Sequence, residues 1–203
     1  MLLYDLTPAP NPWRVRIFLA EKGVEIPTVQ VDAMSGATHT PEFLAKNALG
    51  ELPVLELDDG SYLAESLAIC RYLEGEHPDP PLFGRNATQQ AFVEMWTRRV
   101  ERNLTDVIGR AARHSFEFFK DRIEQFPAYA DSCKRLMRQR WAWFDQEMAD
   151  GRPFIAGQDF TVADIALMSG LRICDFAEEA IPDGLEHAQA WSDRVRARPS
   201  WNA

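Results

Sequence analysis

Cysteine is scarce in this sequence, and long apolar runs are absent from it. The three cysteines, Cys70, Cys133 and Cys174, are too far apart to form a Cys-x-x-Cys pair. We therefore expect no metal site and no disulfide framework, but three buried and reduced thiols. No apolar stretch approaches the ~20 residues that a membrane-spanning helix requires, so the sequence predicts no membrane partner.

Positive charge is also in short supply. Lys and Arg number 22 against 31 Asp and Glu, which gives a formal net charge of −9. Nucleic acid binding depends on a basic face, so this balance disfavours nucleic acid as a partner. The first residues lack the basic stretch and apolar run of a secretory signal. We expect a cytoplasmic protein.

The sequence does contain enough apolar residues for one large or two small packed domains. Hydrophobic residues make up 46% of the 203, which is typical of globular proteins. Short strands are expected at 2–6, 26–31, 53–57 and 61–63, and helices are expected to begin at residues 11–12, 40 and 65. Asp59-Gly60 predicts a tight turn between the last two strands. The order β-α-β-α-β-β-α predicts a small mixed sheet with helices packed on it.

A proline-rich segment at 77–81 separates this part from the rest of the chain. Proline removes a backbone donor and clashes with the preceding helical turn, so no helix continues through it. Beyond it, apolar residues recur at helical spacing over 88–119 (one helix or two), 129–148, 161–176 and 185–197. We expect an α/β domain at 1–77, a linker at 78–87 and an all-helical domain at 88–203.

Two short motifs in the first domain have both a structural and a functional interpretation. Pro53 in Glu51-Leu52-Pro53 is either an ordinary trans proline at a strand start or a cis proline that lets Leu52 pair with an extended, peptide-like ligand. Glu65-Ser66, at the start of the third helix, either caps that helix or binds the ammonium and carboxylate groups of a ligand. Their combination at this spacing favours the functional interpretation.

These motifs lie in segments that resemble the glutathione S-transferase family. The resemblance covers essentially the whole chain and depends on YDLTPAPNPWRVRIFLAEKG, PEFLAKNALGELPVLELDDG, AESLAICRYLE and GQDFTVADIALMSGL. The last segment contains a capping box, Thr161-Val162-Ala163-Asp164. Its role in the family is structural, so Asp164 is not interpreted as catalytic. The resemblance implies a thioredoxin-like N-terminal domain that holds glutathione and an all-helical C-terminal domain that completes a pocket for an apolar electrophile.

The resemblance also assigns residues to each part of glutathione. Glu65 and Ser66 would hold the γ-glutamyl end, and Leu52 would pair its backbone with the cysteinyl part, with Pro53 cis and Glu51 beside it. The loop before Pro41 would reach the glycine carboxylate, with His39 the first candidate and Thr38 the second. A plain surface role for His39 is equally compatible with the sequence.

The sequence departs from the family at the position that should activate the thiol. A free thiol has a pKa near ~8.5 and is mostly protonated at neutral pH. In Ser- and Cys-type members a hydroxyl or thiol contacts the glutathione sulfur from the sixth position before the Val of the Val-Arg pair. That Val is Val15 here, so the position is Ala9, which has nothing to donate. Without a cysteine there, mixed-disulfide chemistry lacks a protein nucleophile, and Cys70, on the apolar side of its helix, is no substitute.

Three residues remain as candidates for the catalytic role. Asn11 is expected to cap the first helix, and its amide could also donate to the sulfur, as an Asn does in some bacterial branches. Thr7 is the only nearby hydroxyl, and His114 in the helical domain could hold a supporting water, as groups of that domain do in one atypical branch. Tyr4 lies in the first strand and is interpreted as structural.

The sequence thus predicts a glutathione transferase that acts in detoxification as a cytoplasmic homodimer. Glutathione would be its co-substrate and a small apolar electrophile its acceptor, in a pocket lined by Arg113, His114 and Phe116 on one side and by Pro8 and Pro10 on the other. One alternative is a glutathione-dependent disulfide reductase or peroxidase. The other is a non-catalytic member of the fold that binds glutathione or only a partner protein.

Overall fold

A computed structural model describes all 203 residues of the chain. The chain divides into two compact units, Met1–Leu82 with Asn202–Ala203, and Phe83–Trp201. The proline-rich segment therefore belongs to the first unit, which extends to Leu82. Leu82 is buried, and its backbone N–H donates to the Glu74 carboxylate at 3.4 Å. None of the helices is both long and apolar enough to cross a membrane.

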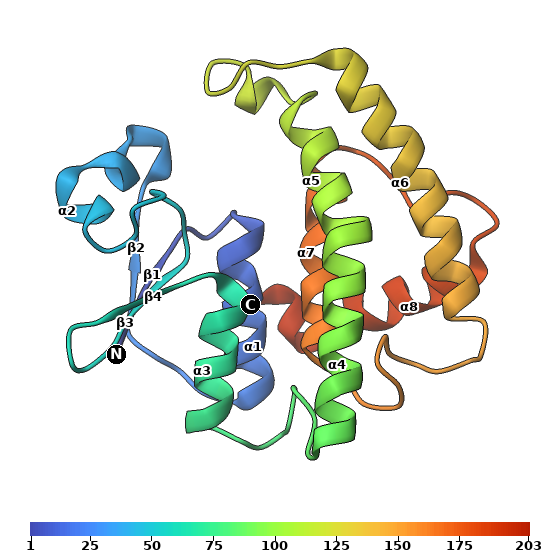
Figure 1. Ribbon diagram of the computed structural model, residues 1–203, viewed down its shortest axis with the longest axis horizontal. Coiled ribbons are helices and arrows are strands. Elements are labelled where there is room, and N and C mark those ends of the chain that lie inside the picture. Colours follow the sequence, from blue (N-terminus) through green and yellow to red (C-terminus); the bar gives the residue numbers. More distant parts are fainter. The chain divides into compact units, whose positions relative to one another are not determined.

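The first unit is built on a four-stranded sheet with the strand order β2-β1-β3-β4 (Figure 1). The strands are β1 (Leu2–Asp5), β2 (Thr28–Gln30), β3 (Val54–Glu56) and β4 (Tyr62–Ala64). β1 pairs with β2 in parallel and with β3 antiparallel, and β3 pairs with β4 antiparallel. This mixed sheet confirms the predicted thioredoxin-like fold, although the first three strands are shorter than the sequence pattern suggested and the fourth begins one residue later.

Three helices accompany the sheet: α1 (Pro10–Lys22), α2 (Pro41–Leu44) and α3 (Ser66–Glu76). Helices α1 and α3 pack side by side (Figure 1), and their apolar residues join those of β1 and β3 in a core that water does not reach. The fully buried members include Leu3, Ile17, Phe18, Leu55, Ile69 and Leu73. Burial of such side chains stabilises the unit by roughly 1.5–3 kcal/mol each. This packing fixes where α1 and α3 begin, which matters for the site.

The second unit is all-helical, as predicted. Its helices are α4 (Ala87–Val100), α5 (Asp106–Arg113), α6 (Pro127–Glu147), α7 (Val162–Phe176) and α8 (Glu186–Arg196). A π-helical turn over Glu101–Thr105 joins α4 to α5, so the predicted helix at 88–119 is two helices that end at Arg113. Most of α7 is buried, which places it at the centre of the unit.

The predicted capping box at the start of α7 is confirmed, and its carboxylate is fully buried. Asp164 accepts hydrogen bonds from the backbone N–H groups of Thr161 (2.9 Å) and Ile155 (3.0 Å) and from the indole N–H of Trp191 (2.9 Å). The carboxylate thereby links the start of α7 to the preceding loop and to α8. Its role is structural.

We predict that Asp164→Ala strongly destabilises the helical unit. The substitution leaves three buried donors unpaired, and each such donor costs about 1–3 kcal/mol. We expect a loss of at least about 3 kcal/mol in the free energy of unfolding, measured by urea denaturation. Exposed Asp159→Ala, five residues earlier, is the matched control and should change stability little. A small effect of Asp164→Ala would contradict this assignment.

Candidate active site

The first helix begins two residues earlier than the sequence predicted, at Pro10 and not at Pro12. Pro10 is the first residue of α1 and Ala9 is its N-cap, with no side-chain capping bond. The prediction that Asn11 caps the helix is therefore wrong. The physical reason is that Pro10 as well as Pro12 suits the first helical position, because proline fixes φ and lacks an N–H that would have no partner there. Asn11 lies inside the first turn, with its side chain exposed and uncommitted.

The alternating prolines leave a single free backbone donor at this end of α1. Pro10 and Pro12 have no N–H. The Ala9 N–H donates to the Leu6 carbonyl at 2.9 Å, and the Trp13 N–H donates to the Ala9 carbonyl at 3.2 Å. Only the N–H of Asn11 has no partner in the chain. Asn11 thus offers an unpaired backbone N–H and a side-chain amide together at the positive end of a helix.

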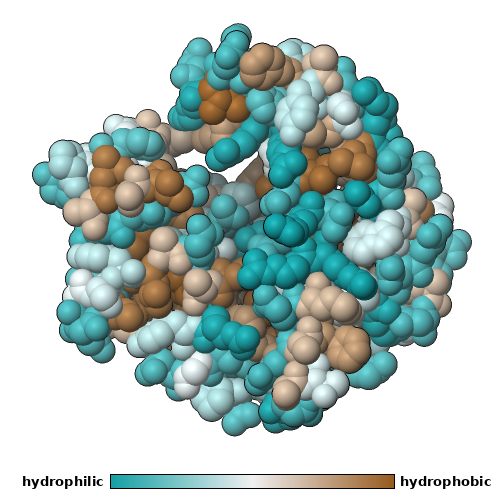
Figure 2. All heavy atoms as spheres, in the orientation of Figure 1, coloured by the Kyte–Doolittle hydropathy of each residue, from teal (hydrophilic) through white to brown (hydrophobic).

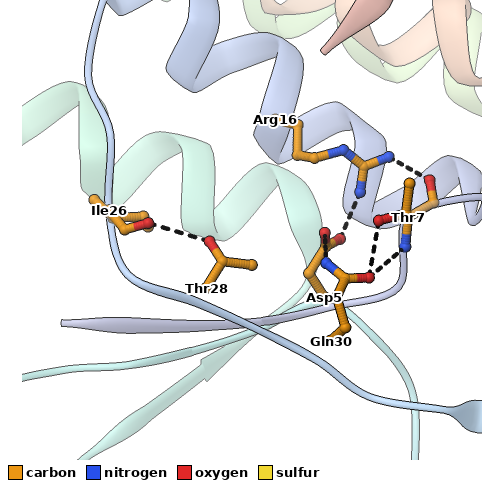
Figure 3. Close-up of polar contacts among 6 residues, drawn as sticks. All are labelled: Asp5, Thr7, Arg16, Ile26, Thr28 and Gln30. Carbon is orange, nitrogen blue, oxygen red and sulfur yellow. Dashed lines mark hydrogen bonds and ion pairs between the residues drawn. The ribbon is translucent and has the colours of Figure 1, made fainter.

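Thr7 is close in sequence, but its hydroxyl proton is already used. Figure 3 shows the Thr7 hydroxyl and backbone N–H both directed at the Gln30 amide oxygen, at 2.9 Å and 2.8 Å. An amide oxygen only accepts, so the hydroxyl must donate to it. Thr7 therefore has no proton left for a ligand sulfur while this bond persists.

Tyr4 is also committed, in agreement with its structural interpretation. Its hydroxyl donates to the Glu56 carboxylate at 2.6 Å, and its ring lies 4.9 Å from the ammonium nitrogen of Lys46. The hydrogen bond to Glu56 raises the pKa of Tyr4 above its ordinary value. Since the same proton cannot also be given to a thiolate, Tyr4 is not the activating group.

Thr38 and His39, the residues predicted to bind the glycine carboxylate, lie against the segment that precedes β3. The Thr38 hydroxyl and His39 Nδ1 are 3.0 Å apart, and Thr38 is buried. Gly50 has a φ of +64°, and a Cβ added there would lie 2.9 Å from the Thr38 carbonyl oxygen and 3.3 Å from the His39 ring. Glycine is needed here for both reasons. The backbone at Gly50 therefore lies against Thr38 and His39, one residue before the segment Glu51-Leu52-Pro53.

The Leu52–Pro53 peptide bond is cis, which is the conformation that the functional interpretation requires. The N–H and C=O of Leu52 have no partner in the chain, although β3 begins only two residues later. The Asn47 side chain holds the adjacent Glu51 carbonyl at 2.9 Å. The backbone of Leu52 can therefore pair with an extended ligand, as β-strand addition requires.

The structure removes the capping explanation for Glu65 and Ser66. Glu65 occupies the N-cap position with a φ of +68° but makes no side-chain capping bond, and Ser66 is the first helical residue. A positive φ is costly for a residue other than glycine and occurs often at functional sites. Ser66 is 5% exposed, and its oxygen accepts from the guanidinium of Arg14 at 3.3 Å. The start of α3 thus combines free N–H groups, a hydroxyl and a nearby cation.

The sequence interpretation did not include Arg14. Its side chain is buried in α1, where Trp13, Val15 and Ile17 are buried too. The signal that could have found it is its position between Trp13 and Val15, two apolar residues of the same helix, since arginine is rarely buried without a partner.

His114 ends α5 in the helical unit. Its Nδ1 accepts the Phe126 backbone N–H at 3.2 Å, which leaves the ring proton on Nε2. Its ring packs edge-on against Tyr129 at 5.1 Å. His114 is therefore an oriented Nε2–H donor in an aromatic setting.

Cys70 in α3 is fully buried, and burial raises the pKa of its thiol well above the ordinary value. It is therefore no nucleophile.

The mixed sheet, with a cis proline before β3 and helices α1 and α3 packed together, defines a thioredoxin-like fold. Family models agree: residues 1–75 match the glutathione S-transferase N-terminal domain and residues 108–199 match the C-terminal domain. The chain is 33% identical to glutathione S-transferase 2 of Saccharomyces cerevisiae over 208 residues, which covers 98% of this chain and 87% of that protein.

Solved structures show the same likeness. A glutathione S-transferase domain-containing protein from Marinobacter aquaeolei has a TM-score of 0.91 and 38% identity, over 98% of this chain and 99% of the other. Gtt2 from Saccharomyces cerevisiae has a TM-score of 0.91 and 32% identity, over 98% of each chain. The chain belongs to the glutathione S-transferase family and is a glutathione transferase.

Proposed function

We propose that this transferase conjugates glutathione to a small apolar electrophile and that Asn11 activates the thiol. The observation that carries the proposal is that Asn11 alone holds an unpaired N–H at the start of α1, beside a free side-chain amide. The glutathione sulfur would accept from these donors, while Leu52 pairs with the cysteinyl backbone. The thiol gives its proton to solvent water, and the thiolate then attacks the electrophilic carbon, so that the S–C bond forms as the leaving group departs with its electron pair.

The start of α1 and one hydrogen bond from Asn11 can together lower the thiol pKa enough, without a hydroxyl at position 9. The positive end of a helix favours an anion by about 0.3–1 kcal/mol in an exposed setting. A hydrogen bond to a charged acceptor adds roughly 1.5–3 kcal/mol. Since one pKa unit equals about 1.4 kcal/mol, the helix and one donor together lower the thiol pKa by roughly one to three units. A lowering of about two units from a pKa near ~8.5 leaves the thiol largely ionised at pH 7.

The rest of glutathione would be held at its two charged ends. Ser66, the N–H groups at the start of α3 and the Arg14 charge behind Ser66 suit the γ-glutamyl carboxylate, and exposed Glu65 suits its ammonium group. His39 and Thr38 suit the glycine carboxylate, beside Glu51. These assignments remain proposals that rest on the arrangement of the donors.

The apolar character of the acceptor is supported by the aromatic side chains beside His114. Phe126 is 51% exposed and Tyr129 is 43% exposed. Figure 2 shows hydrophobic atoms among hydrophilic ones over the α5–α6 connection, at the top of the view. An electrophile with a flat apolar body gains burial and ring contacts on such a surface. Arg113 and Phe116, with Pro8 and Pro10, stay predictions as pocket residues, as do the homodimer and the cytoplasmic location.

We predict conjugation of chlorodinitrobenzene at a rate well above the disulfide reductase rate. Because Ala9 supplies no protein thiol and Cys70 is buried, a disulfide acceptor could react only through bound glutathione. The measurement is the steady-state rate with chlorodinitrobenzene and, separately, with a model disulfide. A larger rate with the disulfide would favour the reductase alternative. Binding of glutathione without thiolate absorbance in the ultraviolet would favour the non-catalytic one.

A further inference from the structure

A buried carboxylate at the end of β1 organises the turn that leads into α1. Asp5 is 1% exposed and forms an ion pair with Arg16 of α1 at 2.6 Å. Its second oxygen accepts from the Gln30 side-chain amide at 2.7 Å (Figure 3). Asp5 and Gln30 are register partners in the parallel pair β1–β2. The carboxylate therefore fixes the orientation of two side chains from two different elements.

Both of those side chains hold the same residue of the turn. Arg16 donates from Nη2 to the Thr7 carbonyl at 2.6 Å, and the Gln30 oxygen accepts from the Thr7 N–H at 2.8 Å and from its hydroxyl at 2.9 Å. Both backbone polar groups of Thr7 are thus bonded to side chains that Asp5 orients. We call Asp5, Arg16 and Gln30 the turn clamp.

The clamp replaces the backbone bonds that the prolines cannot make. Between Thr7 and Pro12, the three prolines leave only the N–H groups of Thr7, Ala9 and Asn11. The clamp takes the first, the Leu6 carbonyl takes the second, and only the third remains. Without the clamp, a turn with so few internal hydrogen bonds could adopt several backbone conformations. The direction of the Asn11 N–H would then change from one conformation to another.

We propose that Asp5, Arg16 and Gln30 are positioning residues for thiol activation, because they hold the turn so that the Asn11 donors meet the glutathione sulfur. The inference rests on the proposed function of Asn11. The clamp does not itself touch the sulfur, and the charged ends of glutathione are held elsewhere. Loosening the clamp should therefore lower kcat and raise the thiol pKa while the KM for glutathione changes little.

Gln30 is the residue to change, because it is exposed and its replacement should not prevent folding. In Gln30→Leu, Thr7 loses the partner of both its N–H and its hydroxyl. We expect the pKa of the bound thiol to rise by about one unit, which lowers the thiolate fraction and kcat roughly ten-fold below that pKa. Amide exchange at Thr7 and Ala9 should quicken. Tyr4→Phe is the control, because it removes a side-chain hydrogen bond from β1, the strand of Asp5, outside the clamp.

Gln30→Glu adds a test that a merely structural role would not pass. A protonated Glu can still donate to Asp5 and accept from Thr7, whereas an ionised Glu places a second negative charge beside Asp5 and near Arg16. The kcat of this variant relative to wild type should approach one at low pH and fall as the pH rises. Wild type measured at each pH supplies the reference, and the thiol pKa of each protein is measured separately by ultraviolet titration.

The outcomes separate the inference from the proposed function. If wild type binds glutathione and lowers its thiol pKa, but the Gln30 variants keep that pKa and kcat and lose only thermal stability, the clamp is merely structural and the inference is overturned. If the wild-type protein does not lower the thiol pKa of bound glutathione, the proposed function fails first, and the inference falls with it. A raised pKa, a lowered kcat and faster exchange in Gln30→Leu, with Tyr4→Phe unchanged, support the inference.

Discussion

Ser66→Asp is expected to abolish glutathione binding while leaving the fold at least as stable. An aspartate at the first position of α3 would place its carboxylate where we propose that the ligand carboxylate binds. It would take the free N–H groups of the helix and the Arg14 contact for itself, and it would repel a second anion. The ligand would lose about two charge-assisted hydrogen bonds, worth roughly 1.5–3 kcal/mol each, so the Kd should rise by about 100-fold or more.

The opposite signs of the two effects make this test specific. A negative charge in the first turn of a helix stabilises the helix by about 0.3–1 kcal/mol, so the melting temperature should hold or rise as affinity is lost. Isothermal titration with glutathione and a thermal melt measure the two quantities. Ser66→Ala is the matched variant, which removes only the hydroxyl and should weaken binding by roughly ten-fold. Unchanged affinity in Ser66→Asp would show that the γ-glutamyl carboxylate binds elsewhere.

The sequence predicted the fold well because its local patterns and its global arrangement agree. Alternating strands and helices, the Asp59-Gly60 turn and the capping box at Thr161 are each set by residues within a few positions of one another. The helix start at Pro10 was missed for a local reason: two prolines, spaced by two, suit the first helical position equally. The choice between them depends on how α1 packs, which the pattern does not contain.

The sequence predicted site residues only where those residues lie in a recognisable motif. Leu52, Pro53, Glu65 and Ser66 stand in motifs that can be recognised without knowing the fold. The turn clamp cannot be recognised in this way, because Asp5 and Gln30 are 25 residues apart and meet only through the register of β1 with β2. Gln30 of the clamp also accepts the hydroxyl proton of Thr7, which removes Thr7 as a donor and leaves Asn11 as the candidate in the first unit.

Asn11→Asp is expected to raise the pKa of the bound thiol by roughly two units or more. The substitution keeps the size of the side chain but removes the amide donor and adds a negative charge beside the developing thiolate. Loss of one hydrogen bond to a charged acceptor costs about 1.5–3 kcal/mol, which is one to two pKa units, and the like charge adds to that. At neutral pH kcat should fall by more than about ten-fold, and by about 100-fold at a pH well below the wild-type thiol pKa. The affinity for glutathione, held at its charged ends, should change far less.

The comparison with Asn11→Ala separates the loss of the amide donor from the added charge. Alanine removes the amide but keeps the unpaired backbone N–H and adds no charge, so the thiol pKa should rise by about one to two units. Thr7→Ala should act less strongly because the Thr7 N–H still reaches Gln30, and His114→Ala tests the donor of the helical unit. Ultraviolet titration of bound glutathione in all four variants measures the thiolate directly. If Asn11→Asp and Asn11→Ala keep the wild-type pKa and His114→Ala raises it, the activating donor is His114, and the start of α1 only accommodates the sulfur.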